Sequence, residues 1–214
     1  MIYLEETYDL VPASPVTLDK LVSLSQERLI KDYEDQGARL VAAWFSDTLQ
    51  YHRVTHVYEL DSLSAFDQFR EKGASNSTFK EGQIKLEELS PVKQTRLLEP
   101  LFPVWVDELH KAIDESRKTP LHTYFLAVLE THPDKFKGIT AGLADGPGML
   151  PIVASWRPIT GKSNCFIDLW KSSLEQKGYE PADDNLKEFF VNLRKAAPTE
   201  RIEHVFTLPY SPLR

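Results

Sequence analysis

The chain contains one strand and turn pattern twice, and this internal repeat constrains its fold more than any single motif does. Three landmarks recur in the same order: Tyr3 and Pro12 return as Tyr124 and Pro133, residues 40–44 (LVAAW) return as 152–156 (IVASW), and residues 97–103 (LLEPLFP) return as 206–212 (FTLPYSP). Three ordered landmarks predict one structural unit that is used twice.

Composition indicates a globular protein and excludes some partners. Of its 214 residues, 42% are hydrophobic and 27% are charged, which is typical of a chain with a sizeable core. A formal net charge of −7 argues against nucleic acid and anionic lipid, because both favour a basic surface. Cys165 is the single cysteine, so no internal disulfide can form. The start lacks a basic and apolar leader pattern, so we expect a cytoplasmic protein with no membrane partner.

The first half predicts four strands and three helices. Residues 2–11 alternate apolar and polar, which is typical of a half-buried strand, and Glu6 is the polar exception on the apolar face. Similar patterns predict helices at 17–33, 64–73 and 79–89, and strands at 40–45, 54–60 and 95–101. The resulting order, with two strands between the helices, is that of ferredoxin-like folds.

The second half repeats this order with a shorter first helix. Strands are predicted at 124–131, 149–156, 165–170 and 202–208, and helices at 134–144 and 186–193. We therefore divide the chain into a ferredoxin-like repeat at 1–103, a connecting helix within 104–121, and a diverged repeat at 122–214. One such unit covers its sheet with helices on one side only, so its other face needs a partner. We expect an α+β fold in which the two tandem repeats form an intramolecular pseudo-dimer.

Several segments resemble proteins of the NIPSNAP family. Residues 54–62 (VTHVYELDS) resemble their third strand and helix entry, the strand with Ile2, Tyr3 and Tyr8 resembles their first, and residues 97–101 resemble their closing strand. The sequence differs from the family pattern at Glu6, where NIPSNAP proteins have an arginine. The resemblance implies the dimeric α+β barrel, whose members include cofactor-independent oxygenases, isomerases and haem enzymes that bind small molecules between sheet and helices.

The candidate site lies in the first half. His56, Tyr58 and Glu6 are predicted on inward strand faces, where His56 would act as a general base and Tyr58 as an orienting donor. Counting back from the next predicted helix places Ile167 and Leu169 at the positions of His56 and Tyr58 in the second half, and Ala127 takes the position of Glu6. Substrate-binding residues are predicted to be Trp44, Tyr8 and Trp156. The alternative interpretation is a hydrogen-bonded core, with the tryptophans as packing residues.

Other patterns do not predict a cofactor or metal site. His52 and His56 are about 13 Å apart along a strand, too far to share one zinc ion. Residues 160–163 (TGKS) lack the earlier glycine of a phosphate-binding loop and instead predict a turn. Cys165 is expected to be buried and inert. Asp168 and Arg157 are expected to form a surface ion pair, with anion recognition as the alternative.

Two functions from different classes remain open. The first is an enzyme or binding protein for a small apolar or aromatic molecule in the barrel cavity, without a metal or other cofactor. The second is a non-catalytic scaffold or interaction module with a filled cavity. Either would exist as a monomer or as a homodimer of pseudo-dimers.

Overall fold

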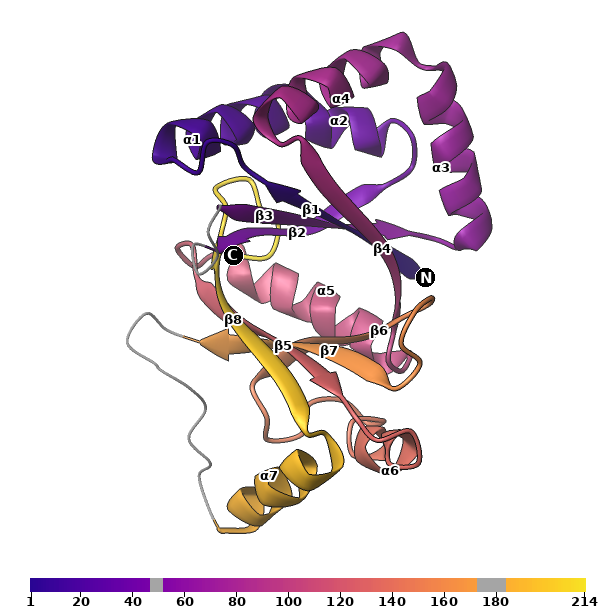
Figure 1. Ribbon diagram of the computed structural model, residues 1–214, viewed down its shortest axis with the longest axis vertical. Helices are drawn as coiled ribbons and strands as arrows, with labels where there is room; N and C mark the ends of the chain where they lie inside the picture. The colour runs from indigo at the N-terminus through magenta and orange to yellow at the C-terminus, as the bar shows by residue number, and fades with distance from the viewer. Residues whose placement is uncertain (47–51, 173–183) are drawn as a thin grey trace.

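The computed structural model describes residues 1–46, 52–172 and 184–214, and the strands of these segments close into one antiparallel barrel (Figure 1). The strands are β1 (Ile2–Asp9), β2 (Arg39–Ser46), β3 (Arg53–Leu60), β4 (Val92–Pro100), β5 (Thr123–Glu130), β6 (Ile152–Pro158), β7 (Cys165–Ser172) and β8 (Thr199–Thr207). Their order around the barrel is β1-β3-β2-β8-β5-β7-β6-β4. Each half therefore supplies four neighbouring strands in the same order, as the repeat predicts.

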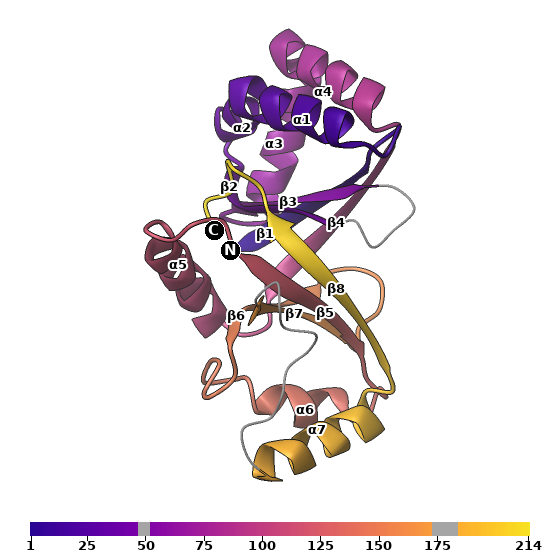
Figure 2. The same ribbon diagram turned by 90° about the vertical axis from the view of Figure 1, so that its left-hand side faces the viewer.

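Helices cover the outer faces of the two half-barrels (Figures 1 and 2). They are α1 (Pro15–Leu24), α2 (Ile30–Glu34), α3 (Leu63–Ser75) and α4 (Ser77–Leu89) in the first half, and α6 (Phe136–Ala141) and α7 (Asp184–Ala196) in the second. A π-helical turn (Ser25–Leu29) joins α1 to α2, so the predicted helix 17–33 is one continuous unit. Helix α5 (Val104–Ser116) lies between the halves and packs against β6. Among the described residues, no helix is long and apolar enough to cross a bilayer.

The same irregularity occurs at the same place in both repeats. The pairing of β2 with β3 shifts between Leu40 and Ala42, and that of β6 with β7 shifts between Ile152 and Ala154. An extra residue in a strand reverses which side chains face inward beyond it. Beyond both shifts, the repeated tryptophans belong to the core inside the barrel.

The core is divided into three parts. One part fills the barrel lumen and contains Trp44 and Trp156. A second lies between the first sheet and α1 to α4, and a third lies between the second sheet and α6 and α7. We call the second and third parts the first and second sheet–helix layers. Alternate residues of each strand face the lumen and a layer, because side chains along a strand alternate in direction.

The register corrects the predicted correspondence between the repeats. His56 lies opposite Glu6 and Ala43, whereas Asp168 lies opposite Ala127 and Ser155 at the matching positions. The partner of His56 in the second repeat is therefore Asp168, and the predicted Ile167 is wrong. By the same register the partner of Tyr58 is Trp170, so the predicted Leu169 is also wrong.

The predicted correspondence was taken from the next expected helix entry and not from strand pairing. The count began at the predicted helix entry after β7, and residues 173–183 lie outside the described part of the chain. Loops change length between related units, whereas paired strands keep their register. A slip of one residue moves a side chain to the opposite face of the sheet, and Ile167 and Leu169 do lie in the lumen.

Candidate functional site

The first sheet–helix layer holds a buried carboxylate whose oxygens both have partners. The hydroxyls of Tyr8 and Tyr33 donate to Oε2 of Glu6 at 2.5 and 2.6 Å. Nζ of Lys93 lies 2.7 Å from Oε1. Three donors around one carboxylate offset much of the cost of burying its charge.

His56 lies beside this carboxylate on β3 and is completely buried. Its Nδ1 lies 3.0 Å from the hydroxyl of Tyr58, and its Nε2 lies 2.7 Å from the hydroxyl of Tyr210. Burial, with a further contribution from the charge of Lys93, lowers the pKa of His56 to about 3. The imidazole is therefore neutral at physiological pH and bonded at both nitrogens.

The structure brings four of the six predicted site residues together and separates the other two. Glu6, Tyr8, His56 and Tyr58 form one cluster in the first layer. Trp44 and Trp156 lie in the lumen core on the opposite face of the sheets, where the ring of Tyr3 meets Trp156 edge to face.

Three further members of the cluster come from distant elements. Tyr33 lies on α2 and stacks on Tyr58 with ring centroids 4.3 Å apart. Lys93 lies on β4, and Tyr210 follows β8 in the other repeat. The helical spacing of Tyr33 predicted an inward position, but no pattern in the sequence connects Lys93 or Tyr210 with His56.

The second sheet–helix layer holds one carboxyl in an apolar setting. Asp168 is only 3% exposed, and Oγ of Ser155 donates to its Oδ1 at 2.6 Å. Among the described residues, no lysine, arginine or histidine forms an ion pair with it. Burial raises its pKa to about 7, against a lowering by the Ser155 hydrogen bond and with a further rise from the charge of Glu200.

The predicted surface pair between Asp168 and Arg157 is wrong. Nε of Arg157 lies 2.7 Å from Oε1 of Glu99 on the neighbouring strand β4. Arg157 is exposed at the surface, whereas Asp168 faces the second layer two positions from Phe166. The residue of β6 opposite Asp168 is Ser155, whereas Arg157 lies two positions further along β6, opposite Glu99 of β4, which is why these two do not meet.

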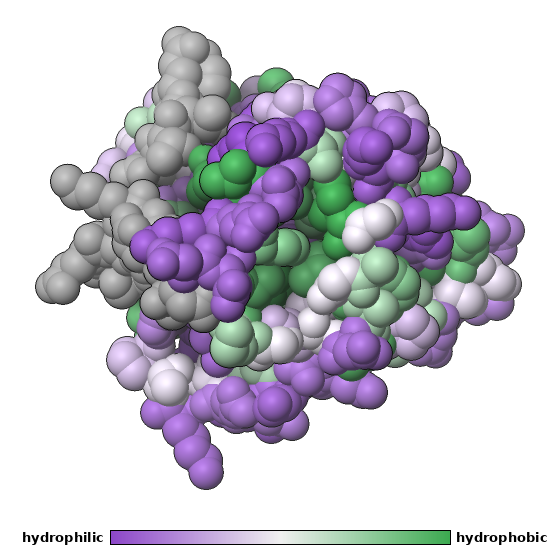
Figure 3. All heavy atoms as spheres, turned by 90° about the horizontal axis from the view of Figure 1, so that it is seen from below, coloured by the Kyte–Doolittle hydropathy of each residue, from purple (hydrophilic) through white to green (hydrophobic). Residues whose placement is uncertain are grey.

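Helix α7 covers the second layer loosely. None of its residues is buried, although it carries a strongly apolar face. A cavity of about 110 Å³ lies beneath it, lined by Leu129, Phe190, Leu193, Arg194, Ala197 and Glu200. Seen from below, this end of the molecule has a hollow with apolar side chains at its floor and polar side chains around it (Figure 3).

Asp168 belongs to the same layer as this cavity. Ala127 lies opposite Asp168 on β5 and faces the same side of the sheet as Leu129, which lines the cavity. Glu200 lines the cavity and is close enough to influence the pKa of Asp168. The second layer therefore combines mostly apolar side chains, a small cavity bordered by the ion pair of Arg194 and Glu200, and one carboxyl whose pKa is raised to about 7.

Other reactive groups are not gathered into a site. Within the described ranges, no group of three or more His, Cys, Asp or Glu residues is placed to hold a metal ion. Cys165 is buried as predicted, and burial raises the pKa of its thiol.

Comparison with known proteins establishes the fold. In sequence, the chain matches no protein-family model and no curated protein. In structure, a candidate monooxygenase from Fusobacterium nucleatum matches over 97% of this chain and 92% of its own, with a TM-score of 0.64 and 9% identity. An anthrone oxidase-like protein matches over 97% and 91%, with a TM-score of 0.55 and 8% identity.

The resemblance to NIPSNAP proteins has narrower support. A NIPSNAP domain protein from Burkholderia xenovorans covers 47% of this chain and 94% of its own, with a TM-score of 0.41 and 17% identity. This match is partial and distant. The full-length matches and the strand order together show that the chain has the dimeric α+β barrel fold, built from two halves of a single polypeptide.

Proposed function

We propose that the protein binds a small aromatic molecule in the second sheet–helix layer and transforms it by proton transfer to Asp168. One observation carries the proposal: Asp168 is a buried carboxyl with a single hydroxyl partner and no cation partner in the described part of the chain. A buried acid without charge compensation costs stability, and such groups gather at functional sites. A cavity of about 110 Å³ under α7 belongs to the same layer, although Asp168 does not line it.

The chemistry follows from the pKa of this carboxyl. A base is most effective when its pKa lies near the working pH, and burial raises the pKa of Asp168 to about 7. Its carboxylate would remove a proton from an acidic C–H or phenolic O–H group of the bound molecule. The apolar side chains of the layer would hold the rings and exclude water, which strengthens the interaction of the carboxylate with that proton.

The likeness of fold to an anthrone oxidase-like protein suggests a test reaction. Anthrone carries an acidic CH2 group, and dioxygen converts it to anthraquinone and water. One oxygen atom enters the ring system, and the other leaves as water with the two hydrogens of the CH2 group. In the proposed reaction, Asp168 takes the first proton, so that dioxygen oxidises the resulting resonance-stabilised anion, and the proton then leaves with the water.

The first layer has a structural role in this proposal. Glu6, Tyr8, His56 and Tyr58 are buried and hydrogen-bonded, and the bond from Tyr33 to Glu6 ties α2 to the first sheet. This dense packing also favours a second candidate function, a non-catalytic scaffold. The proposed enzyme requires the Asp168 carboxylate for its activity, whereas a scaffold does not.

Dioxygen consumption with anthrone distinguishes the two. We expect the wild-type protein to accelerate the reaction, with a rate that rises with pH through about 7 as Asp168 loses its proton. Asp168→Asn should lower the rate by about 100-fold or more. The matched control is Asp134→Asn, which alters an exposed aspartate paired with Lys135 and should leave the rate unchanged.

Other results would contradict the proposal. An Asp168→Asn variant as fast as the wild type would remove Asp168 from the site. A wild-type rate equal to that in buffer would overturn the oxidation of this substrate class and favour the scaffold. His56→Gln is expected to keep the rate, and a large loss would move the site back to the first layer.

A further inference from the structure

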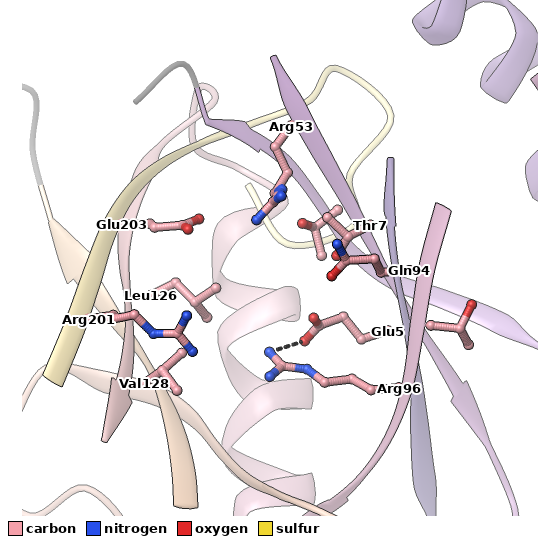
Figure 4. Close-up of a pocket in the computed structure, with 11 residues that line it drawn as sticks. Glu5, Thr7, Arg53, Gln94, Arg96, Leu126, Val128, Arg201 and Glu203 are labelled. Atoms are coloured by element: carbon pink, nitrogen blue, oxygen red, sulfur yellow. Dashed lines mark hydrogen bonds and ion pairs between the residues drawn. The ribbon is translucent and has the colours of Figure 1, made fainter. Parts of the chain in front are cut away.

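The open end of the barrel lumen contains a polar cavity that neither sheet–helix layer reaches (Figure 4). Its volume is about 200 Å³, and it is lined by Glu5, Thr7, Arg53, Thr55, Gln94, Thr95, Arg96, Leu126, Val128, Arg201 and Glu203. Strands β1, β3 and β4 of the first repeat form one wall, and β5 and β8 of the second form the other. The cavity exists only because the two repeats face each other.

Two of its three arginines are held by carboxylates of the first repeat. Nη2 of Arg96 donates to Oε2 of Glu5 at 2.8 Å. Arg53 donates to both carboxylate oxygens of Asp9, at 2.8 and 3.1 Å. Arg96 on β4 and Arg53 on β3 flank β1, which carries both carboxylates, so each guanidinium group is held against that strand.

The third arginine is different. Arg201 is exposed to solvent and forms no hydrogen bond or ion pair with any residue in the described ranges, and its guanidinium points into the cavity from β8 (Figure 4). Nε of Arg96, in contrast, is buried and has no acceptor within those ranges. A buried donor without a partner is costly, and unpaired guanidinium groups are specific binders of planar anions.

The charges and the shape of the cavity define the ligand. Three arginines and two glutamates line it, and Asp9 pairs with Arg53, so Arg201 is the one lining arginine without a carboxylate partner in the described ranges. Leu126 and Val128 form an apolar strip beside Arg201 on the second wall (Figure 4). A doubly charged phosphate would be repelled by Glu5 and Glu203, whereas a singly charged carboxylate with an apolar body matches the single charge of Arg201 and the strip.

We propose that this lumen cavity binds a small organic monocarboxylate, whose carboxylate group pairs with Arg201. The cavity lies on the opposite face of the sheets from Asp168 and shares no residue with the second layer. The inference therefore stands apart from the proposed oxidation. The carboxylate would bridge the two repeats, because Arg201 belongs to the second wall and Arg53 and Arg96 to the first.

Isothermal titration calorimetry with sodium benzoate tests the proposal. Benzoate should bind the wild-type protein at least tenfold more tightly than benzamide, its neutral counterpart, and more tightly than inorganic phosphate. Arg201→Gln should weaken benzoate binding about tenfold or more, because it removes the unpaired charge. Arg157→Gln is the matched control, since Arg157 is an exposed strand arginine outside the cavity, and it should not change the affinity.

A second variant should change the affinity for benzoate in the opposite direction. Glu203→Gln removes a negative charge from the wall and should tighten benzoate binding about three- to tenfold. Equal affinities for benzoate and benzamide, or an unchanged affinity in Arg201→Gln, would overturn the proposal, and tighter binding of phosphate would overturn the assigned ligand class. Asp168→Asn should keep the benzoate affinity, which separates this test from the proposed oxidation.

Discussion

The two sheet–helix layers occupy equivalent positions in the fold, but their buried polar groups have different numbers of partners. In the first layer, the carboxylate of Glu6 has two tyrosine donors and a lysine, and His56 is bonded at both nitrogens. In the second layer, Asp168 has one serine partner and a loosely packed helix above it. The register places His56 and Asp168 at the same position of the repeat.

The difference shows how two copies of one fold can come to have different properties. A polar network whose members are all satisfied contributes to a single well-defined packing, and its groups are held away from other partners. A buried carboxyl with few partners weakens the fold but stays available for proton transfer. The first repeat is thus suited to stability, and the proposed function assigns the chemistry to the second.

Removal of the central carboxylate should have the largest effect. Glu6→Ala leaves Lys93 without its buried partner and two tyrosine hydroxyls without their acceptor, so it should lower the free energy of unfolding by about 3–5 kcal/mol. Urea unfolding monitored by circular dichroism measures this. Glu99→Ala removes only a surface pair with Arg157 and should cost less than about 1 kcal/mol. Similar losses in both variants would show that the first layer does not depend on its ion cluster.

Asp168→Asn should stabilise the protein at pH 8. The native carboxyl keeps its proton up to a pKa of about 7, whereas the unfolded chain loses it near 4, so the free energy of unfolding falls as the pH rises between these values. Above pH 7 the variant has no carboxyl to ionise, so its free energy of unfolding, measured with urea, should exceed that of the wild type by about 1–4 kcal/mol. At pH 3.5 the gain should disappear, and a gain that persists there would refute the assignment to this carboxyl.

His56 should show the opposite dependence on pH. Its pKa is about 3 in the native protein and near 6.5 when unfolded, so the unfolded chain binds the additional proton and native stability falls as the pH drops through this window. His56→Gln should remove this loss, which is about 1–2 kcal/mol at pH 5 relative to pH 8. Between about pH 4 and 6.5, the contributions of His56 and Asp168 oppose each other. Urea unfolding of the two single variants over this range should therefore change the slope in opposite directions, and changes in the same direction would refute the comparison.

Ser155→Ala should have the smallest effect. The hydroxyl of Ser155 lowers the pKa of Asp168, so its loss should move the titration midpoint of this carboxyl above 7. Carbon-13 NMR of labelled aspartate follows the carboxyl directly. Ser163→Ala, in the exposed turn between β6 and β7, is the control and should leave the midpoint in place. A midpoint that moves down would show that the hydroxyl does not stabilise the charged form.

The layout of the strands was predictable because their pattern is local. Alternation along β1 placed Glu6 and Tyr8 on one face, and the same alternation on β3 placed His56 with Tyr58. Since β1 and β3 are neighbours in the predicted fold, their polar side chains could be expected to meet. The repeated strand with Trp44 and Trp156 likewise predicted two equivalent halves, and the strand order confirms them.

The partners and the environment of each site were not predictable in this way. Lys93 and Tyr210 reach the first cluster from strands and loops far along the chain, and Arg201 reaches the lumen cavity from the other repeat. The burial of Asp168 depends on the packing of the second layer and on a strand register that the sequence count assigned incorrectly by one residue.

By itself, the sequence determined the duplication, the order of elements and the alternation of faces along β1 and β3, because these follow from periodicities of neighbouring residues. Only the tertiary structure decided which polar groups meet, how deeply each is buried and how its pKa responds. Those properties depend on contacts between distant segments, and a pattern that repeats along the chain carries no information about the distance between them. The contrast between His56 and Asp168 is therefore a property of the folded barrel.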